Sequence, residues 1–322
     1  MLSRVAESIF WMQRYRERAE NIARFIDVNL NLSLDMPHDR LTQWFPLVQT
    51  SGDKELFDSR YSEADEKNVI EFLTFDTENP NSILSCLMKA REGARTVREI
   101  ITSEMWQEIN MAYLFVRRAA GDRRLMRSNY EFYSRIRRQC QLFNGIADSS
   151  MSRNEAWHFG KLGSLIERAD KTSRILDVKY FMLLPSAEYV GTPFDNIQWC
   201  ALLKSASALE MYRKIWHQVY HAHVVDFLVL NPDFPRAILC CISEAEESLH
   251  AISGTPRDKF SNAPERIMAR LRVELASQHA ADIIRTGLHE FLNDLQMKLA
   301  DVNSSISNTF FARYPVRFKQ PV

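Results

Sequence analysis

The sequence is poor in residues that interrupt helices and in the patterns that mark common enzymes. It has only nine glycines and eleven prolines in 322 residues, so long segments are free to form helix. The nucleotide-binding patterns GxxxxGK[ST] and GxGxxG are absent, as are the zinc-protease pattern HExxH and the hydrolase pattern GxSxG. We therefore expect no cofactor on this chain, and we expect any ATP used in its reaction system to be bound by another protein.

The chain also lacks long apolar runs and a net charge. No run of 18 apolar residues occurs, so we expect no membrane-spanning helix, and the first 21 residues lack the apolar run of a signal peptide. The 41 basic residues balance 41 acidic ones, which makes nucleic acid an improbable partner. The cysteines show no CxxC or zinc spacing, so we expect buried, reduced thiols in a cytoplasmic protein: Cys86, Cys140, Cys200, Cys240 and Cys241.

What the sequence does contain is a repeat. ERAENIARFIDV at residues 17–28 matches ERADKTSRILDV at residues 167–178, with six identities at an offset of 150. Residues 69–92 align without a gap to residues 224–247, at an offset of 155. Self-similarity at a fixed spacing is typical of repeated structural units. It predicts two related halves, residues 1–150 and 151–322, packed tightly as one pseudo-symmetric unit.

Helical periodicity runs through both halves and predicts an all-α fold. Apolar residues recur every three or four positions on the first long helix, at Ile9, Met12, Tyr15, Ala19, Ile22, Ile26 and Leu30. The second copy keeps this stripe at Phe159, Leu162, Leu165, Ala169, Leu176 and Tyr180. Ser152 and Glu155 fit a capping box before the second copy. Further continuous helices are expected over residues 91–119 and 199–221.

Several segments together resemble a known family. The opening MLSRVAESIFWMQRYRERAENIARFID, the segment ITSEMWQEIN at residues 101–110, and Trp157-His158-Phe159 followed by IERADKTSRILDVKY resemble the bacterial Alpha-E family, an all-helical domain. The resemblance implies an association, by gene neighbourhood or fusion, with ATP-grasp ligase-like and transglutaminase-like proteins. It therefore implies an ATP-grasp-type ligase as partner, a transglutaminase-like protein as a second partner, and a peptide as substrate.

The polar residues of the repeated helix have two interpretations. Glu20 with Arg24 and Asp170 with Arg174 lie four residues apart, a spacing that places opposite charges side by side. Such pairs either lock adjacent helices or hold an anionic, peptide-like ligand. Because a single active site seldom needs the same residues twice, the repeated pairs favour a scaffold.

Residues without an obvious second copy therefore supply most of a candidate catalytic cluster. Its carboxylates would act in acid–base chemistry and its arginines as electrostatic clamps. The alternative is that these are buried structural polar groups. The candidates are Glu7, Arg14, Glu17, Arg91 and Glu104.

A basic stretch at residues 117–138 contains eight arginines and only two acidic residues. Such a stretch binds nucleic acid or an acidic partner, or forms a solvated helix face. The balanced total charge favours an acidic protein partner among the binding alternatives. The proposed partner-binding residues are Arg123, Arg124 and Arg127.

Histidines raise the question of a metal. The runs Glu155–His158 and Glu247–His250 have the ExxH spacing of carboxylate-bridged di-iron bundles, but they do not correspond across the repeat. His217, His221 and His223 form HxxxHAH, a weak zinc-like spacing. We interpret them as exposed or capping residues, so no metal ligand is assigned.

Taken together, the sequence predicts an accessory or substrate-presenting helical component of a bacterial peptide-ligation or peptide-modification system. It would work with an ATP-grasp-type ligase. One alternative is an enzyme in its own right, which uses the Glu/Arg cluster between helices for amide-bond chemistry. A weaker alternative is a basic-surface protein that binds nucleic acid.

Overall fold

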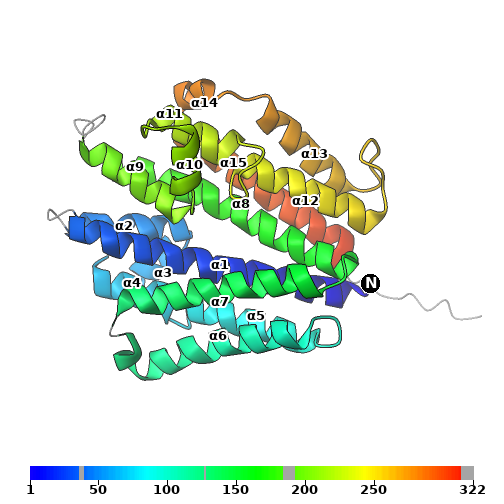
Figure 1. The fold of residues 1–322 in the computed structure, drawn as a ribbon, viewed down its shortest axis with the longest axis horizontal. Coiled ribbons are helices and arrows are strands. Elements are labelled where there is room, and N and C mark those ends of the chain that lie inside the picture. Colours follow the sequence, from blue (N-terminus) through cyan, green and yellow to red (C-terminus); the bar gives the residue numbers. More distant parts are fainter. Residues whose placement is uncertain (36–39, 127, 184–192, 313–322) are drawn as a thin grey trace, which may run out of the picture.

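The computed structural model describes residues 1–35, 40–126, 128–183 and 193–312. All regular secondary structure in these ranges is helical, which confirms the predicted all-α class (Figure 1). The elements are α1 (Ser3–Asp35), α2 (Arg40–Ser51), α3 (Lys54–Asp58), α4 (Glu66–Thr74), α5 (Ile83–Thr96), α6 (Ser103–Gly121), the 3₁₀ turn η1 (Arg123–Met126), α7 (Asn129–Ser150), α8 (Glu155–Leu183), α9 (Pro193–Ser205), α10 (Leu209–Ile215), α11 (His221–Val225), the π-helical turn η3 (Asp226–Leu230), α12 (Ile238–Ser253), α13 (Ala263–Ala276), α14 (Ala280–Thr286), α15 (Leu288–Ile306) and the π-helical turn η4 (Ser307–Phe311).

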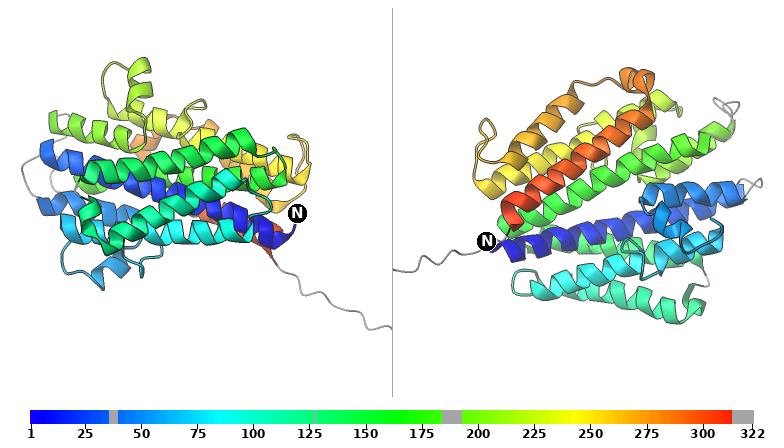
Figure 2. Two further views of the ribbon diagram at one scale, coloured as in Figure 1. Left: turned by 60° about the horizontal axis from the view of Figure 1, so that its bottom comes forward. Right: turned by 180° about the vertical axis from the view of Figure 1, so that it is seen from behind.

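Two long helices, α1 and α8, run side by side through the middle of the molecule (Figures 1 and 2). Helix α1 also packs against α5 and α7, whereas α8 also packs against α12 and α15. One apolar cluster includes buried side chains from helices on both sides of the central pair. Each central helix is therefore surrounded by neighbours over most of its circumference.

A glycine allows the two central helices to approach closely. A Cβ atom built on Gly163 of α8 would lie 2.4 Å from the carbonyl oxygen of Phe10 in α1. A methyl group cannot occupy that space, so the close approach requires glycine. A Cβ atom built on Gly160, three residues earlier, would lie 3.2 Å from Cγ of Gln13 and 3.3 Å from Cγ2 of Ile9. The crossing point of α1 and α8 is set by these contacts.

Most residues of the predicted apolar stripes are buried, whereas Tyr15 and Leu30 are partly exposed. Ile9, Met12, Ala19 and Ile26 of α1 are at most 1% exposed, and the matching residues of α8 are buried wherever their side chains are described. The polar face of α1 is buried as well, contrary to the exposed ion pairs that an amphipathic surface helix would have. The buried polar residues of α1 are Gln13, Arg14, Arg16, Glu17, Glu20, Asn21, Arg24, Asp27 and Asn29.

Three local predictions are wrong. Asn154, rather than the Ser152 capping box, caps α8: its Oδ1 accepts from the amides of Ala156 and Trp157, and Glu155 contacts the Met1 amino group instead. The helix expected over 91–119 is broken between α5 and α6, because Thr102 caps the start of α6. The helix expected over 199–221 ends at residue 205, just before the left-handed backbone of Ser207 (φ 53°).

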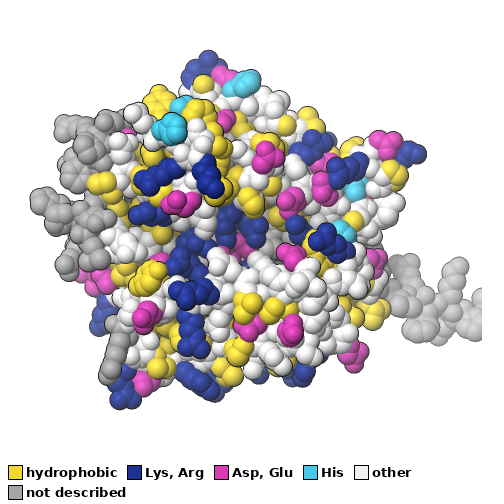
Figure 3. All heavy atoms as spheres, in the orientation of Figure 1, with side chains coloured by type: hydrophobic (Ala, Val, Ile, Leu, Met, Phe, Trp, Pro, Cys, Tyr) yellow, Lys and Arg dark blue, Asp and Glu magenta, His cyan; other side chains and the backbone are white. Residues whose placement is uncertain are grey.

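Cationic side chains lie close together on one face of the molecule. Lys and Arg side chains gather around a hollow in the middle of the face in Figure 3, between the α7 side and the α8–α12 side. Among the helices of the described ranges, none is long and apolar enough to cross a membrane.

Candidate functional site

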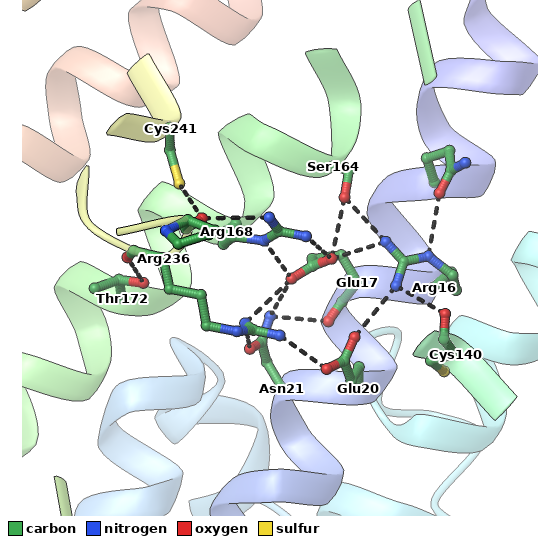
Figure 4. Close-up of polar contacts among 12 residues, drawn as sticks. Arg16, Glu17, Glu20, Asn21, Cys140, Ser164, Arg168, Thr172, Arg236 and Cys241 are labelled. Carbon is green, nitrogen blue, oxygen red and sulfur yellow. Dashed lines mark hydrogen bonds and ion pairs between the residues drawn. The ribbon is translucent and has the colours of Figure 1, made fainter. Parts of the chain in front are cut away.

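The centre of the molecule holds a carboxylate from α1 bound by an arginine from α8. Arg168 donates from Nε to Oε1 of Glu17 at 3.0 Å and from Nη2 to Oε2 at 3.1 Å (Figure 4). This is the parallel two-bond geometry that makes arginine–carboxylate pairs strong and directional. The side chain of Glu17 is fully buried.

The reverse arrangement occurs with the other Glu-Arg dipeptide. Arg18 of α1 donates from Nε and Nη2 to the two oxygens of Glu167 in α8, at 2.6 and 2.9 Å. Arg14 adds a bond from Nε to Oε2 of Glu167 at 2.9 Å. Glu17-Arg18 and Glu167-Arg168 therefore exchange ion pairs across the α1–α8 contact, and we call this set the Glu–Arg network.

Further donors saturate Glu17. Arg16 contacts its Oε2 at 2.7 Å, and the hydroxyl of Ser164 donates to the same oxygen at 3.0 Å. Arg236, from the turn before α12, reaches Oε1 at 3.3 Å and also binds Glu20 at 2.8 Å. Glu17 thus accepts from three guanidinium groups in a space without solvent exposure.

The electrostatics keep both central carboxylates ionised. Burial alone would raise the pKa of Glu17, but the charges of Arg168, Arg16 and Arg236 hold that pKa well below its ordinary value. Burial likewise opposes ionisation of Glu167, whereas Arg18, Arg14 and Lys171 lower its pKa to about 2. Near neutral pH both groups are therefore carboxylates, and neither can donate a proton.

A small cavity adjoins the network. Its volume is about 100 Å³, and it lies between the start of α8 and parts of α1 and α7. Ser164, Arg168, Lys161 and Asn144 contribute polar groups to its lining, and Trp157 contributes an aromatic side chain. The cavity can hold a group a few heavy atoms in size, such as a carboxamide or a short side chain.

The five predicted catalytic residues do not form one cluster. Arg14 and Glu17 both lie in the Glu–Arg network, although they bind different partners. Arg91 donates to Asn110 at 2.7 Å and pairs with Glu92, which places it between α5 and α6.

The other two predicted carboxylates make no contact with the network. Glu7 is half-buried near the start of α1, and Glu104 is exposed in the first turn of α6. The side chain of neither one forms a hydrogen bond or ion pair with another residue of the described ranges, and neither lines the cavity.

Two of the three predicted partner-binding arginines, Arg123 and Arg124, lie on the surface. Arg123 pairs with Glu71 at 2.7 Å and its guanidinium lies 3.6 Å from the centroid of the Phe75 ring. Arg124 pairs with Asp122 at 2.8 Å and is 80% exposed. Arg127 lies outside the described residues.

Three of the histidines considered above contact aromatic or backbone groups, among them His221, whose ring centroid lies 4.3 Å from that of Tyr220. His223 stacks on Trp216 with ring centroids 3.7 Å apart, whereas His217 is exposed. His250 lies 3.2 Å from the carbonyl of Thr255 through Nδ1, and Glu247 pairs with Arg257. Across the described parts of the chain, no three His, Cys, Asp or Glu side chains lie close enough to hold a metal ion.

Arg16, Ser164 and Arg236 contribute to the network but were not predicted from the sequence. The repeated residues were interpreted as a scaffold. The repeat itself was the available signal for the two dipeptides. Arg236 carried no comparable signal, because it comes from a turn more than 200 residues away and only the tertiary fold brings it to Glu17.

Comparison with known proteins agrees with this architecture. A profile of the Alpha-E family, described as a predicted alpha-helical domain with a conserved ER motif, matches residues 1–311. Uncharacterized proteins of Mycobacterium bovis and Mycobacterium tuberculosis are 23% identical over 96% of this chain. The chain spans 37% of the length of these relatives, and no solved structure is significantly similar to it. Because the family match extends over nearly the whole chain, the protein belongs to the Alpha-E family.

Proposed function

We propose that this protein is an accessory, substrate-presenting component of a peptide-ligation or peptide-modification system, and that its Glu–Arg network is a scaffold. The observation that carries this proposal is the burial of Glu17 and Glu167 against cationic side chains. Both carboxylates are fully buried, and each is bound by at least two cationic side chains. A general acid or base works best with a pKa near the working pH and needs access to the reacting proton. Neither carboxylate meets these requirements.

The proposed partner is an ATP-grasp-type ligase, with a transglutaminase-like protein as a second partner. The surface arginines Arg123 and Arg124 would bind an acidic patch on the ligase. Within this chain the two arginines pair with Glu71 and Asp122 at the surface. Exposed ion pairs contribute at most about 1 kcal/mol each. Replacing Glu71 and Asp122 by carboxylates of the ligase therefore costs little free energy. The length of the mycobacterial relatives also supports a role beside other domains, because their matching segment is a minor part of each chain.

Binding to a purified ATP-grasp ligase tests this proposal. Titration of the ligase with the chain, followed by fluorescence anisotropy, should give a dissociation constant in the micromolar range or below. The double variant Arg123→Gln/Arg124→Gln should weaken it about tenfold. Arg95→Gln is a matched control, since Arg95 is also an exposed, ion-paired arginine but lies on α5. Absence of a complex at micromolar concentration, or equal weakening by the control, would refute this interface.

An enzyme with amide-bond chemistry is the second candidate, and the cavity beside Ser164 and Arg168 favours it. In that case a peptide group would enter the cavity and contact Lys161, a partly exposed lining residue; Glu7 and Arg14, named from the sequence for this chemistry, do not line it. Lys161→Gln should then abolish product formation while the melting temperature changes little, because the ion pair that Lys161 forms with Glu244 is partly exposed. Product formation that survives this substitution removes this candidate. A nucleic-acid-binding function is weaker, since the balanced charge does not support it.

We further propose that residues 1–150 and 151–322 are related halves of one pseudo-symmetric unit, and that the protein works in the cytoplasm. The reciprocal ion pairs support the first point, because Arg18 binds Glu167 just as Arg168 binds Glu17. The free thiols support the second, because a reducing compartment keeps cysteines unpaired.

A further inference from the structure

Three arginines meet beside the Glu–Arg network. Arg24 comes from α1, Arg137 from α7 and Arg236 from the turn before α12, and we call this set the arginine cluster. Their side chains are 6, 19 and 12% exposed, respectively. Glu20 binds Arg24 and Arg236, both at 2.8 Å, and Asp27 lies 2.8 Å from Arg137.

Positive charge is in excess at this point. Arg16, Arg24, Arg137, Arg168 and Arg236 form ion pairs with only three carboxylates, Glu17, Glu20 and Asp27. Five guanidinium groups against three carboxylates leave a formal charge of two positive units. Two neutral side chains also take part: Asn21 accepts from Arg236, and Gln141 donates to Glu20 at 3.4 Å. Buried charge without a counterion is costly.

The arginine cluster also has donors without acceptors. Arg24 binds Glu20 through Nη2, and Nη2 of Arg137 lies 2.8 Å from Oδ2 of Asp27. The Nε of each arginine is buried with no hydrogen-bond partner in the described chain, and so is Oδ1 of Asp27. Burial, followed by the nearby charges of Arg236 and Arg137, lowers the pKa of Arg24 despite its bond to Glu20. An unpaired buried donor of this kind is a frequent sign of an absent water or ion.

The corresponding region around Glu167 differs in this respect. Arg14 and Arg18 there bond through Nε to Glu167, and Arg174 bonds through Nε to Asp170. The unpaired Nε groups therefore distinguish the α7 side of the molecule. On that side, Figure 3 shows cationic side chains gathered around the central hollow.

We infer that the arginine cluster is a binding site for an oxyanion, either a carboxylate or a phosphate group. Guanidinium groups match the oxygen spacing of both anions and bind them through paired hydrogen bonds. An anion here would neutralise the excess charge and accept from the unpaired donors. The site is separate from the surface arginines proposed to contact a ligase, so the two proposals can fail independently.

Calorimetric titration of the full chain with inorganic phosphate and with acetate tests this inference. Each titration is compared with sodium chloride at equal ionic strength. Binding of phosphate alone identifies a phosphate site, binding of acetate alone identifies a carboxylate site, and binding of both identifies a general oxyanion site. No binding of either anion beyond the chloride control overturns the inference.

Substitutions locate the site. Arg24→Gln and Arg137→Gln should each weaken anion binding at least about tenfold, since each removes a charged donor. Arg138→Gln is the matched control, because Arg138 is the exposed neighbour of Arg137 on the same helix. If Arg137→Gln does not fold, Asp27→Asn/Arg137→Gln removes the pair together and should also lose binding. Unchanged affinity in the folded variants, or an equal loss in Arg138→Gln, rejects the arginine cluster as the site.

Discussion

Arg168 binds both carboxylate oxygens of Glu17 across the contact between the two central helices, at 3.0 and 3.1 Å. Glu17 also accepts from Arg16 and Arg236, so one buried carboxylate balances guanidinium groups from three segments of the chain. Its removal would leave several buried cations without their counterion. The network therefore holds α1, α8 and the turn before α12 together by ion pairs.

The first prediction concerns the buried carboxylate of Glu17. Glu17→Gln should lower the free energy of unfolding by about 3–5 kcal/mol, because it leaves buried cations uncompensated. Urea unfolding followed by circular dichroism measures the loss. Glu104→Gln, at an exposed position, is the control and should change stability by less than about 0.5 kcal/mol. A Glu17→Gln protein of near-normal stability that had lost an enzymatic activity would support the catalytic interpretation instead.

The second prediction concerns acid. The pKa of Glu167 is lowered to about 2 in the folded state, from an ordinary value near 4.5. A depressed folded pKa stabilises the protein above the unfolded value, and this stability is lost as the pH falls from about 4.5 to about 2. Glu17 and Asp170, whose pKa values are also lowered, act in the same direction.

Urea midpoints measured between pH 2 and pH 7 test this prediction. The urea midpoint of the unmodified protein should fall steeply below pH 4.5. The midpoint of Glu167→Gln should be lower at pH 7 and should decrease less as the pH falls. Burial raises the pKa of Asp27 and of Asp177, so these two groups oppose the trend. A midpoint that is constant down to pH 2.5 contradicts the proposed ionisation of the network.

The third prediction concerns the helix crossing. Gly163→Ala should destabilise the fold by about 1–3 kcal/mol, since the new methyl group collides with the carbonyl oxygen of Phe10. Gly145→Ala in α7 is the control: a Cβ there meets nothing within 4 Å, so the change should stabilise by up to about 1 kcal/mol. Thermal unfolding of both variants gives the comparison, and equal effects would contradict the close approach.

The fourth prediction concerns thiol reactivity. Burial raises the pKa of Cys86 and of Cys241 to about 12, and it also raises the pKa of Cys140. Because the thiolate is the reactive form, these thiols should resist iodoacetamide at pH 8. Cys200, which is only half-buried, should react first. Peptide mass spectrometry after brief labelling distinguishes the sites, and early labelling of Cys86 would contradict the packing of α5 against α1.

The sequence alone determined the helical class, the positions of most helices and the apolar stripes of α1 and α8. These features depend on residue spacing along one helix, which is local information. Periodicity also placed Glu20 beside Arg24 and Asp170 beside Arg174, and both ion pairs are present. Helix breaks at Thr102 and Ser207 were missed because a single cap or a single left-handed residue outweighs the periodicity around it.

Only the tertiary structure decided what the polar residues do. An amphipathic pattern cannot reveal that the polar face of α1 is also covered, because the covering helices α7 and α8 lie more than 100 residues away. Because the interior has a lower dielectric constant than water, the buried ion pairs of α1 interact more strongly than the same pairs would at the surface. For the same reason, the sequence could name Glu17 and Arg14 but could not give their partners. Glu167, Arg168 and Arg236 reach them only through the packing of the helices.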